Sequence, residues 1–481
     1  MKYFVLIPIV FPMIMAIIGT KVKFKSEKER NVFLYTTVIL NLAVLIELFI
    51  QGEAFTIHLV KVSSFLDVYF KIDKLGILFS ILASTLWIFT TSYSIEYMKH
   101  ERDEKRFFIF FLATLGITVG IALSGNLFTM YIFYELLTLS TFPLVIHAES
   151  KDALYSGKKY LIYSFGGATL ALLGMMILYS ITNNLDFIPK GVVMGISYDK
   201  TLMLIAYMSM FIGFGVKAAM VPLHSWLPAA MVAPTPVSSL LHAVAVVKSG
   251  VFALIRVSYF LVGAQVIAEI NGNKYISVLV VLTILMGSFL ALHQDNLKKR
   301  LAYSTISQLG YMVLGIVLLN KEALTGAIMH LINHAVIKIT LFFCVGAIYY
   351  KTHKKNIGDI EAIGKNMPIT MWCFSIAAIS LIGIPPTNAF VSKWYLALGG
   401  LDDKIIFPII ILLSAFLTAM YILPIVITAF FHIEENKDER NLDPSRKMLI
   451  PIITLTGIIV FLGLFPNVVL NFVKSIVAEV L

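Results

Sequence analysis

Charge and cysteine are both scarce in this chain. Of its 481 residues, 14% are charged and 59% are hydrophobic, whereas a soluble domain carries about 25% charged residues. A water-soluble fold of this length could not keep so much apolar surface away from water. The composition therefore excludes a soluble globular protein, and it predicts one all-α polytopic membrane domain over residues 1–481.

The chain has two cysteines, Cys344 and Cys373, which lie far apart inside apolar stretches without a CxxC pair. This spacing supports neither an iron–sulfur cluster nor a structural zinc site, so both are predicted to be small apolar packing residues. Signatures for nicotinamide, flavin or haem are also lacking. We therefore expect no cofactor, no resident metal and no redox step in this polypeptide itself.

A basic stripe interleaved with aromatic residues is lacking too, although the net charge is +10. The lysines and arginines occupy short loops between apolar stretches, so nucleic acid is not an expected partner.

Apolar stretches of about twenty residues recur along the chain, and each can cross a ~30 Å hydrocarbon core as a helix. We predict about fourteen spans, at residues 3–20, 31–50, 68–92, 107–124, 126–147, 158–181, 201–222, 237–259, 275–293, 299–319, 322–349, 368–397, 404–431 and 449–472.

The loops between these spans differ in basic residues. Loops after odd-numbered spans carry three to five lysines and arginines each, except the loop after the seventh, which carries none. Loops after even-numbered spans carry at most two. Because cytoplasmic loops are enriched in lysine and arginine, the odd loops are predicted to be cytoplasmic and both termini extracytoplasmic. The charged stretch Glu434–Lys447 is expected to be solvated.

Two spans are predicted to be broken helices. Span 7 ends near Gly213, Gly215 and Pro222, and span 12 contains Gly383 followed by Pro385-Pro386. Proline removes a backbone hydrogen bond, and a membrane tolerates the freed carbonyls only beside protein or water. Paired broken helices in corresponding positions are the best sequence pointer to an ion path.

Four ionisable residues stand near these breaks or in mid-span: Glu135, Lys217, Lys248 and Lys393. A charge at the bilayer centre costs at least about 2.5 kcal/mol on insertion scales. Intramembrane ionisable groups are therefore hypothesised to be functional, here as proton carriers. The alternative is a static buried ion pair that holds helices together.

Span 11 places His330, His334 and Lys338 at intervals of four residues, on one face of a helix. Histidine changes charge near neutral pH, so this file of groups suits proton transfer. A zinc site is the weaker interpretation, since no third ligand or HExxH glutamate accompanies the two histidines. The remaining alternative is a hydrogen-bonded core histidine.

Other polar residues receive structural interpretations. Arg256 lies near a predicted span end and is expected to reach the interface with its long side chain. His224, His242 and His293 are expected to have mixed roles, lining water or satisfying backbone carbonyls.

Several motifs around these residues resemble a known family. They are YELLTLSTFPLV around Glu135, PLHSWLPAAMVAPTPVSSLLHA after Lys217, VKSG with Lys248, LKKRLAYSTISQLGYM, HLINHAVIK and GIPPTNAFVSKW. From about residue 65 to 430 the chain is similar to the antiporter-like membrane subunits of respiratory complex I, Mrp sodium/proton antiporters and membrane-bound hydrogenases.

This resemblance implies fourteen helices around a central hydrophilic axis, with two inverted five-helix repeats at 107–259 and 275–431. It implies an input pair formed by Glu135 and Lys217, and a central Lys248. It also implies a bridge of His334 and Lys338, and an exit-side Lys393. Because one branch of the family carries glutamate at the exit position, the lysine here favours the N-type and L-type subunits and the D-type Mrp subunit. The motif around Glu135 and the overall length favour the D-type.

The expected function is therefore proton translocation, with or without sodium antiport, inside a multisubunit complex in the cell membrane. The expected partners are other membrane subunits, lipid, H+ and Na+. Whether a redox reaction drives the complex stays open, and so does any enzymatic role of the assembly. The alternative is a free-standing secondary transporter of a small solute, against which the polar groups form a line rather than one cluster.

Overall fold

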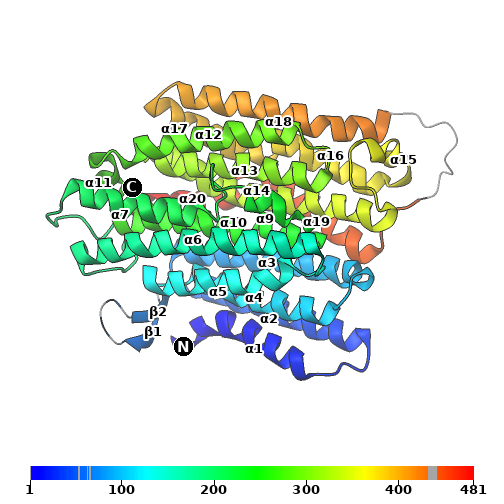
Figure 1. Cartoon of the computed structure of the whole chain (residues 1–481), viewed down its shortest axis with the longest axis horizontal. Helices are drawn as coiled ribbons and strands as arrows, with labels where there is room; N and C mark the ends of the chain where they lie inside the picture. The colour runs from blue at the N-terminus through cyan, green and yellow to red at the C-terminus, as the bar shows by residue number, and fades with distance from the viewer. Residues whose placement is uncertain (1, 53–54, 62, 64, 66, 432–440) are drawn as a thin grey trace.

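The chain folds into helices that run roughly side by side along the long axis of the molecule (Figure 1). This computed structural model describes residues 2–52, 55–61, 63, 65, 67–431 and 441–481. The predicted charge run Glu434–Lys447 lies partly outside the described residues.

Within the described residues, eleven helical segments are long and apolar enough to cross a membrane. They are α1 (Ile7–Lys21, preceded by the 3-10 turn η1, Lys2–Leu6), α2 (Glu27–Gln51), α3 (Lys74–Tyr97, followed by η2, Met98–His100), α4 (Glu104–Ala122), α5 (Leu127–Val145), α6 (Lys151–Thr182), the segment of α9 (Thr235–Ala243), α10 (Val246–Ile255) and the π-helical η4 (Arg256–Val262), α12 (Gly272–Leu292), α14 (Lys321–Thr352), α18 (Ile406–Phe431) and α19 (Arg446–Leu464).

The other helices are shorter or more polar. Two are apolar but short, α7 (Lys200–Gly215) and α16 (Pro368–Ile382). The rest are α8 (Trp226–Ala229), η3 (Ala230–Val232), α11 (Ala264–Glu269), α13 (Leu297–Val317), η5 (Gly358–Ile360), α15 (Ile363–Asn366), α17 (Asn388–Asp403) and α20 (Asn467–Val480). The all-α polytopic class is confirmed, whereas the count of fourteen spans and the two repeats at 107–259 and 275–431 stay predictions.

Short polar side chains begin many of these helices. Each accepts a hydrogen bond from the backbone N–H three residues later, which satisfies a donor that the helix leaves free. These caps are Ser26, Asp73, Asn126, Ser150, Asp199, Asn296 and Asn320.

The predicted span at 68–92 was wrong at its start, because an antiparallel hairpin of β1 (Thr56–Lys61) and β2 (Asp67–Lys71) precedes α3. Tyr69 of β2 fixes the hairpin to the bundle, since its hydroxyl donates to the Gly125 carbonyl (2.9 Å) and to Asp186 (2.7 Å). A short apolar run cannot be assigned to strand or helix by its periodicity alone.

Both of the spans predicted to be broken helices are interrupted. A third span, for which no break was predicted, is interrupted as well. Helix α7 ends at Gly215, and α16 and α17 are separated by residues 383–387. The predicted span 237–259 is also broken, between α9 and α10 at Val244 and Ala245. No proline or glycine marks that third break, so no local pattern predicts it. The predicted span 449–472 likewise divides into α19 and α20.

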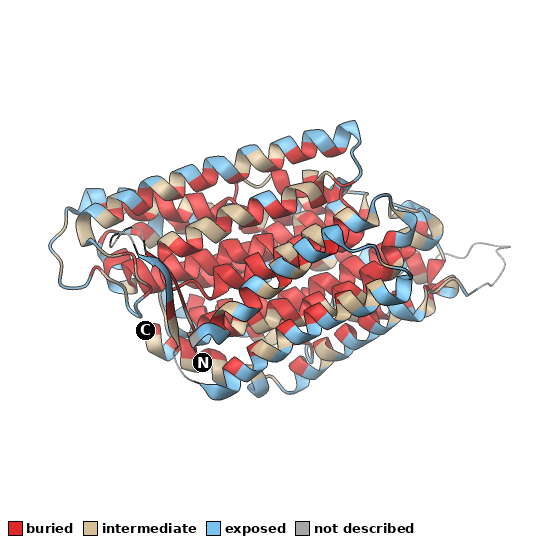
Figure 2. Ribbon diagram, turned by 90° about the horizontal axis from the view of Figure 1, so that it is seen from below, coloured by how far each residue is buried: buried red, intermediate tan, exposed pale blue. Residues whose placement is uncertain are grey.

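The middle of the bundle is occupied by α14 and by the α9–α10–η4 segment. Both are buried along their whole apolar length, while α1, α2 and α19 leave most of theirs on the outside. Figure 2 shows this as buried ribbon surrounded by helices with exposed outer faces. Polar side chains on the two central segments are therefore shielded from lipid. Cys344 and Cys373 are buried free cysteines, as predicted.

Arg256 is buried, so the expectation that it reaches the interface was wrong. Its guanidinium forms two hydrogen bonds of 2.6 and 2.8 Å with Asp73, and it lies 4.6 to 5.0 Å from the rings of Phe187, Phe252 and Phe260. Its side chain is 0% exposed. Its partner lies 183 residues earlier, a pairing that no local pattern could reveal.

Candidate functional site

The predicted lysines and histidines lie deep in the bundle on several different elements. Lys217 follows the end of α7, Lys248 lies on α10, and Lys393 lies on α17. Lys217 and Lys248 are fully buried, and Lys393 is 6% exposed. The other members, His330, His334 and Lys338, share one buried face of α14.

The centre of the site is a direct contact between α10 and α14. The Lys248 Nζ atom lies 2.8 Å from Nδ1 of His334, and it donates to the carbonyl of His242 at 2.5 Å. That carbonyl belongs to the last turn of α9, just before the break. The break therefore supplies an acceptor for the ammonium, while the imidazole offers a site to which a proton can pass.

His330 continues this contact toward α17. Its ring centroid lies 5.7 Å from that of His334, its Nδ1 lies 2.8 Å from Ser392 Oγ, and its Nε2 lies 2.9 Å from Gln308 Oε1. Both ring nitrogens are thus occupied by neutral partners. Ser392 lies on α17, directly before Lys393 in the chain, so the histidine pair extends from the central lysine toward the helix that carries the exit-side one.

Lys338 points from α14 toward α13. Its Nζ donates to Ser304 Oγ at 2.8 Å and to the Leu301 carbonyl at 3.1 Å. Ser304 is bonded in turn to the Tyr421 hydroxyl at 2.8 Å. Lys338 therefore lies on a side branch, one helical turn beyond His334.

Lys393 is held by the break between α16 and α17. Its Nζ donates to the carbonyls of Leu381 and Ile382, both at 2.8 Å. These are the last carbonyls of α16, and the break leaves them without helical partners. Gly383, with φ +94°, lets the chain turn there, and a Cβ at this position would lie 2.9 Å from Lys393 Cδ.

The expected pair of Glu135 and Lys217 is only partly formed. The Lys217 ammonium donates to the Tyr134 carbonyl and lies 3.5 Å from the centre of the Tyr134 ring. Glu135, the next residue on α5, is half-buried, with Oε1 lacking a hydrogen-bond partner. No ion pair joins the two in the described chain, although the Lys217 ammonium is bonded to the residue directly before Glu135.

Neutral atoms hold all four buried ammonium groups. Within the described part of the chain, Lys217, Lys248, Lys338 and Lys393 bond to carbonyls, a hydroxyl and an imidazole rather than to carboxylates. The geometry therefore differs from the static buried ion pair considered as the alternative.

The sequence interpretation missed three polar residues that connect the charged ones: Ser304, Gln308 and Ser392. The first two stand in the LKKRLAYSTISQ motif, one helical turn apart on the buried face of α13. That i, i+4 spacing of polar residues in a membrane helix was the signal that could have found them.

His242 is a further buried group beside the site. Both ring nitrogens lack hydrogen-bond partners, and the ring stacks on Phe342 at 4.7 Å. Its backbone carbonyl accepts a hydrogen bond from Lys248 Nζ, so this residue adjoins the central lysine.

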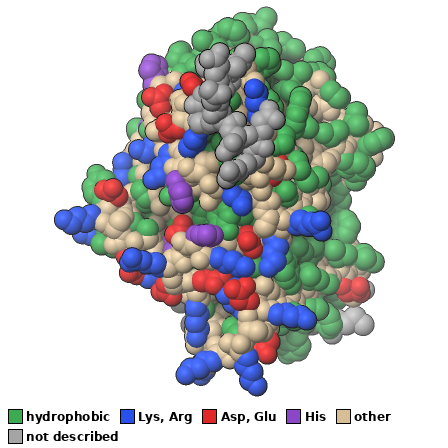
Figure 3. All heavy atoms as spheres, turned by 90° about the vertical axis from the view of Figure 1, so that its right-hand side faces the viewer, with side chains coloured by type: hydrophobic (Ala, Val, Ile, Leu, Met, Phe, Trp, Pro, Cys, Tyr) green, Lys and Arg blue, Asp and Glu red, His purple; other side chains and the backbone are tan. Residues whose placement is uncertain are grey.

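A cavity of about 330 Å³ opens at the bundle end predicted to be cytoplasmic, with Val345 of α14 in its lining. It is lined by Glu101, Lys298 and Lys355 among others, and Lys298 Nζ donates to the Ala233 carbonyl at 2.6 Å. Burial raises the pKa of the Glu101 carboxyl above its usual value, and the Lys298 charge opposes that rise. Figure 3 shows charged side chains gathered over this end of the molecule.

Comparison with known proteins identifies two family matches along the chain. Residues 124–418 match the family described as NADH:quinone oxidoreductase/Mrp antiporter, transmembrane, and residues 60–108 match the N-terminal part of complex I chain 5. Together these matches cover all of the candidate site residues.

Two curated relatives represent the two kinds of complex. NADH-quinone oxidoreductase subunit N of Desulforudis audaxviator is 33% identical over 393 residues, which are 77% of this chain and 76% of that protein. The Na(+)/H(+) antiporter subunit A1 of Staphylococcus haemolyticus is 32% identical over 430 residues, 83% of this chain. The chain spans 52% of that antiporter subunit.

Solved structures share the fold over nearly the whole chain. A subunit of the archaeal membrane-bound sulfane sulfur reductase superposes with a TM-score of 0.87 at 22% identity, covering 99% of this chain and 97% of that one. A subunit of the Mrp complex from Dietzia sp. superposes with a TM-score of 0.86 at 20% identity, covering 100% and 97%.

Proposed function

Because this chain belongs to the family of NADH:quinone oxidoreductase and Mrp antiporter membrane subunits, we propose that it is the proton-translocating subunit of a multisubunit membrane complex. The observation that carries this proposal is the contact between Lys248 Nζ and His334 Nδ1, at 2.8 Å in the buried centre of the bundle. A lysine and an imidazole at this distance can exchange a proton without bulk water.

From this centre the proton has a route outward. His330 is the next group on this route, with its ring centroid 5.7 Å from that of His334 and its Nδ1 bonded to Ser392. Lys393, beside the break between α16 and α17, is the proposed final carrier. The carbonyls freed at such a break, and water beside them, can accept hydrogen bonds from the lysine ammonium on the extracytoplasmic side.

The inward route uses the side branch. The cavity with Glu101 and Lys298 is the proposed entrance from the cytoplasm, followed by Lys338 with Ser304 and then by His242 near Lys248. The partnerless ring nitrogens of His242 suit a group that binds a proton transiently.

Glu135 and Lys217 are the proposed control pair at the other end of the line. Because no ion pair fixes them in the described chain, the Glu135 carboxylate is free to approach or leave the Lys217 ammonium. Its approach favours the charged lysine, and its withdrawal favours release of the proton.

We further propose that this chain is a counterpart of the D-type Mrp subunit and exchanges Na+ for H+ across the cell membrane. Both of its termini then lie outside the cell. The similarity to a Na(+)/H(+) antiporter subunit supports sodium exchange, and the lysine at position 393 supports the subunit type. The alternative is that this chain is the corresponding subunit of a redox-driven complex. The similarity to a quinone oxidoreductase subunit supports this alternative.

The test is proton flux in vesicles reconstituted with the purified complex, measured with a pH-sensitive dye with and without a sodium gradient. Glu135→Gln and Lys217→Ala should each lower flux to background while the complex still assembles. The matched control is the exposed ion pair of Lys200 and Glu269, whose atoms lie 2.9 Å apart, changed to Ala and Gln. Near-normal flux in Glu135→Gln or Lys217→Ala would refute the assigned roles.

A further inference from the structure

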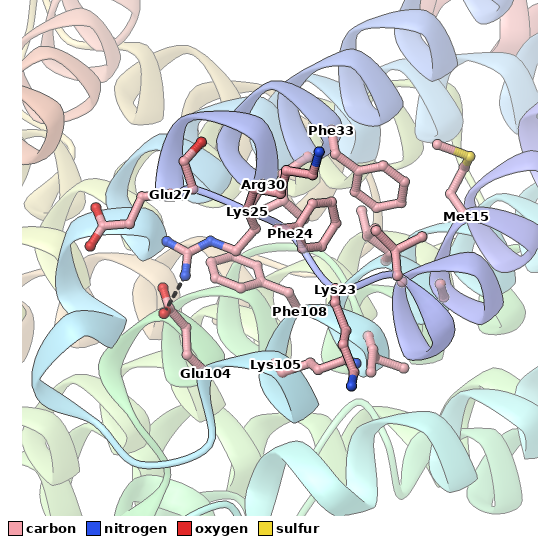
Figure 4. A pocket seen from close by; sticks show the side chains of 17 residues that line it. Met15, Lys23, Phe24, Lys25, Glu27, Arg30, Phe33, Glu104, Lys105 and Phe108 are labelled. Carbon is pink, nitrogen blue, oxygen red and sulfur yellow. Dashed lines mark hydrogen bonds and ion pairs between the residues drawn. The ribbon is translucent and has the colours of Figure 1, made fainter.

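A second cavity, of about 480 Å³, lies away from the proton path, between one end of α1, α2 and α4 (Figure 4). The loop of residues 22–26, which joins α1 to α2, forms its rim. The count of lysines and arginines predicts this end of the bundle to be cytoplasmic. The cavity therefore lies where a cytoplasmic-leaflet headgroup would meet the first part of its acyl chains.

The inner wall of this cavity is apolar. Met15 and Gly19 line it from α1, Phe33 from α2, and Phe108 and Leu112 from α4. Met15 precedes the end of α1 by six residues, so the wall reaches about 9 Å below the helix end at 1.5 Å per residue. That depth suits the upper part of an acyl chain.

The rim is basic, with Lys23, Lys25 and Lys105 among the lining residues. Lys105 Nζ donates to the Thr20 carbonyl at 2.7 Å, which holds it at the end of α1. Figure 4 shows Lys23 and Lys105 extending toward the same side of the rim.

The nearby carboxylates are already engaged. Glu104 is paired with Arg30, Glu27 lies 3.3 Å from Lys99, and Glu29 accepts from the Lys25 backbone N–H. In the described chain, the side-chain ammonium groups of Lys23, Lys25 and Lys105 consequently have no carboxylate partner. Unpaired cations above an apolar wall complement a molecule that has a negative head and an apolar tail.

We propose that this cavity binds an anionic phospholipid, with its phosphate at Lys23 and Lys105 and an acyl chain against Met15, Gly19 and Phe33. Charge complementarity decides the class of lipid, because the apolar wall alone would accept a zwitterionic lipid equally well. Basic residues at the cytoplasmic surface attract anionic lipids in this way.

The experiment equilibrates the purified complex with lipid nanodiscs containing phosphatidylcholine and phosphatidylglycerol, then counts retained lipid by native mass spectrometry. The wild-type complex should retain phosphatidylglycerol in preference to phosphatidylcholine. Lys23→Gln with Lys105→Gln should reduce that preference several-fold. The control, Lys151→Gln with Lys158→Gln, removes the same charge from exposed positions at the start of α6 and should keep the preference.

A third variant tests the apolar part of the site. Gly19→Leu keeps every charge, and a Cβ at this position meets only Phe33 and Ile109, at 3.8 and 3.9 Å, so the added atoms occupy the cavity without a clash at Cβ. It should lower the amount of retained phosphatidylglycerol. Unchanged retention in Gly19→Leu or in the Lys23/Lys105 variant would overturn the proposal. So would a photoreactive group at residue 19 that cross-links to another subunit instead of to lipid.

Discussion

The four buried lysines of the candidate path share one kind of environment. Their ammonium groups bond to backbone carbonyls, to the Ser304 hydroxyl and to the His334 ring. Neutral acceptors of this kind stabilise an ammonium without holding its proton as a carboxylate would. At each of these lysines, proton flux should therefore depend more on the ability of the side chain to release its proton than on its positive charge.

Lys393 offers the sharpest test of this difference. Lys393→Arg should lower proton flux at least about tenfold although the charge is kept, because a guanidinium does not release its proton in proteins. Lys393→Glu should retain part of the flux, since a carboxyl group also carries a proton. The measurements are dye-detected flux and subunit assembly, with Lys404→Arg, at the exposed end of α17, as the control. An active arginine variant would remove Lys393 from the path.

His334 tests the centre of the path in the same way. His334→Gln keeps a polar side chain near Lys248 but cannot bind a proton near neutral pH, so flux should fall to background while the complex assembles. The control is His293→Gln at the exposed end of α12, where Nδ1 is bonded to the Phe289 carbonyl of the same helix at 2.9 Å. Equal losses of flux in both variants would argue against a relay through His334.

At the scale of elements, the broken helices supply the acceptors that single residues use. The break after α9 leaves the His242 carbonyl for Lys248, and the break after α16 leaves two carbonyls for Lys393. Gly250 of α10 lets that helix approach the segment after α7, since a Cβ there would lie 2.5 Å from the Ala218 nitrogen. The geometry of the breaks thus decides where the lysines can be held.

Gly383 makes this dependence measurable. Gly383→Ala should cost about 1 kcal/mol of backbone strain at φ +94° and should push Lys393 from its carbonyls, because the new methyl group meets Lys393 Cδ. The loss of proton flux should be larger than the small loss of thermal stability can explain. Gly457→Ala on α19, where a Cβ would meet nothing within 4 Å, should leave both unchanged, and equal behaviour of the two variants would contradict the proposed role of the break.

At the scale of the whole molecule, buried polar contacts tie distant parts of the chain together. Arg256 joins the end of α10 to Asp73 at the start of α3, and the Tyr93 hydroxyl of α3 donates to the Phe343 carbonyl of α14 at 2.9 Å. Such contacts fix the positions of the central helices without taking part in the proposed relay.

Arg256→Ala should therefore lower stability rather than specific activity. Removing one partner of a buried ion pair costs about 3 kcal/mol or more, so the melting temperature of the purified complex should fall clearly. Arg256→Met with Asp73→Asn should recover part of that loss, because no unpaired charge is left inside. Flux per assembled complex is the second measurement, and a selective loss of flux at unchanged stability would show that this pair belongs to the path.

The purified polypeptide, separated from its partners, should carry neither a redox cofactor nor a bound metal. Its sequence has no nicotinamide, flavin, haem or iron–sulfur signature, and both nitrogens of His330 are occupied by Ser392 and Gln308. Visible absorbance and metal analysis are the measurements. Stoichiometric iron, flavin or zinc would refute the prediction, and zinc would point to His330 and His334.

The membrane class, most helix positions and the breaks in spans 7 and 12 could be predicted from the sequence, because apolar run length, proline and glycine act locally. The sequence also marked Glu135 and the buried lysines and histidines, since an ionisable residue in mid-span is visible without a structure. The tertiary structure alone decided that Lys248 meets His334, that Ser392 and Gln308 hold His330, and that Arg256 pairs with Asp73. It also decided the break at Val244 and Ala245. These features depend on which helix faces pack against each other across distant parts of the chain, and a local sequence pattern does not determine that packing.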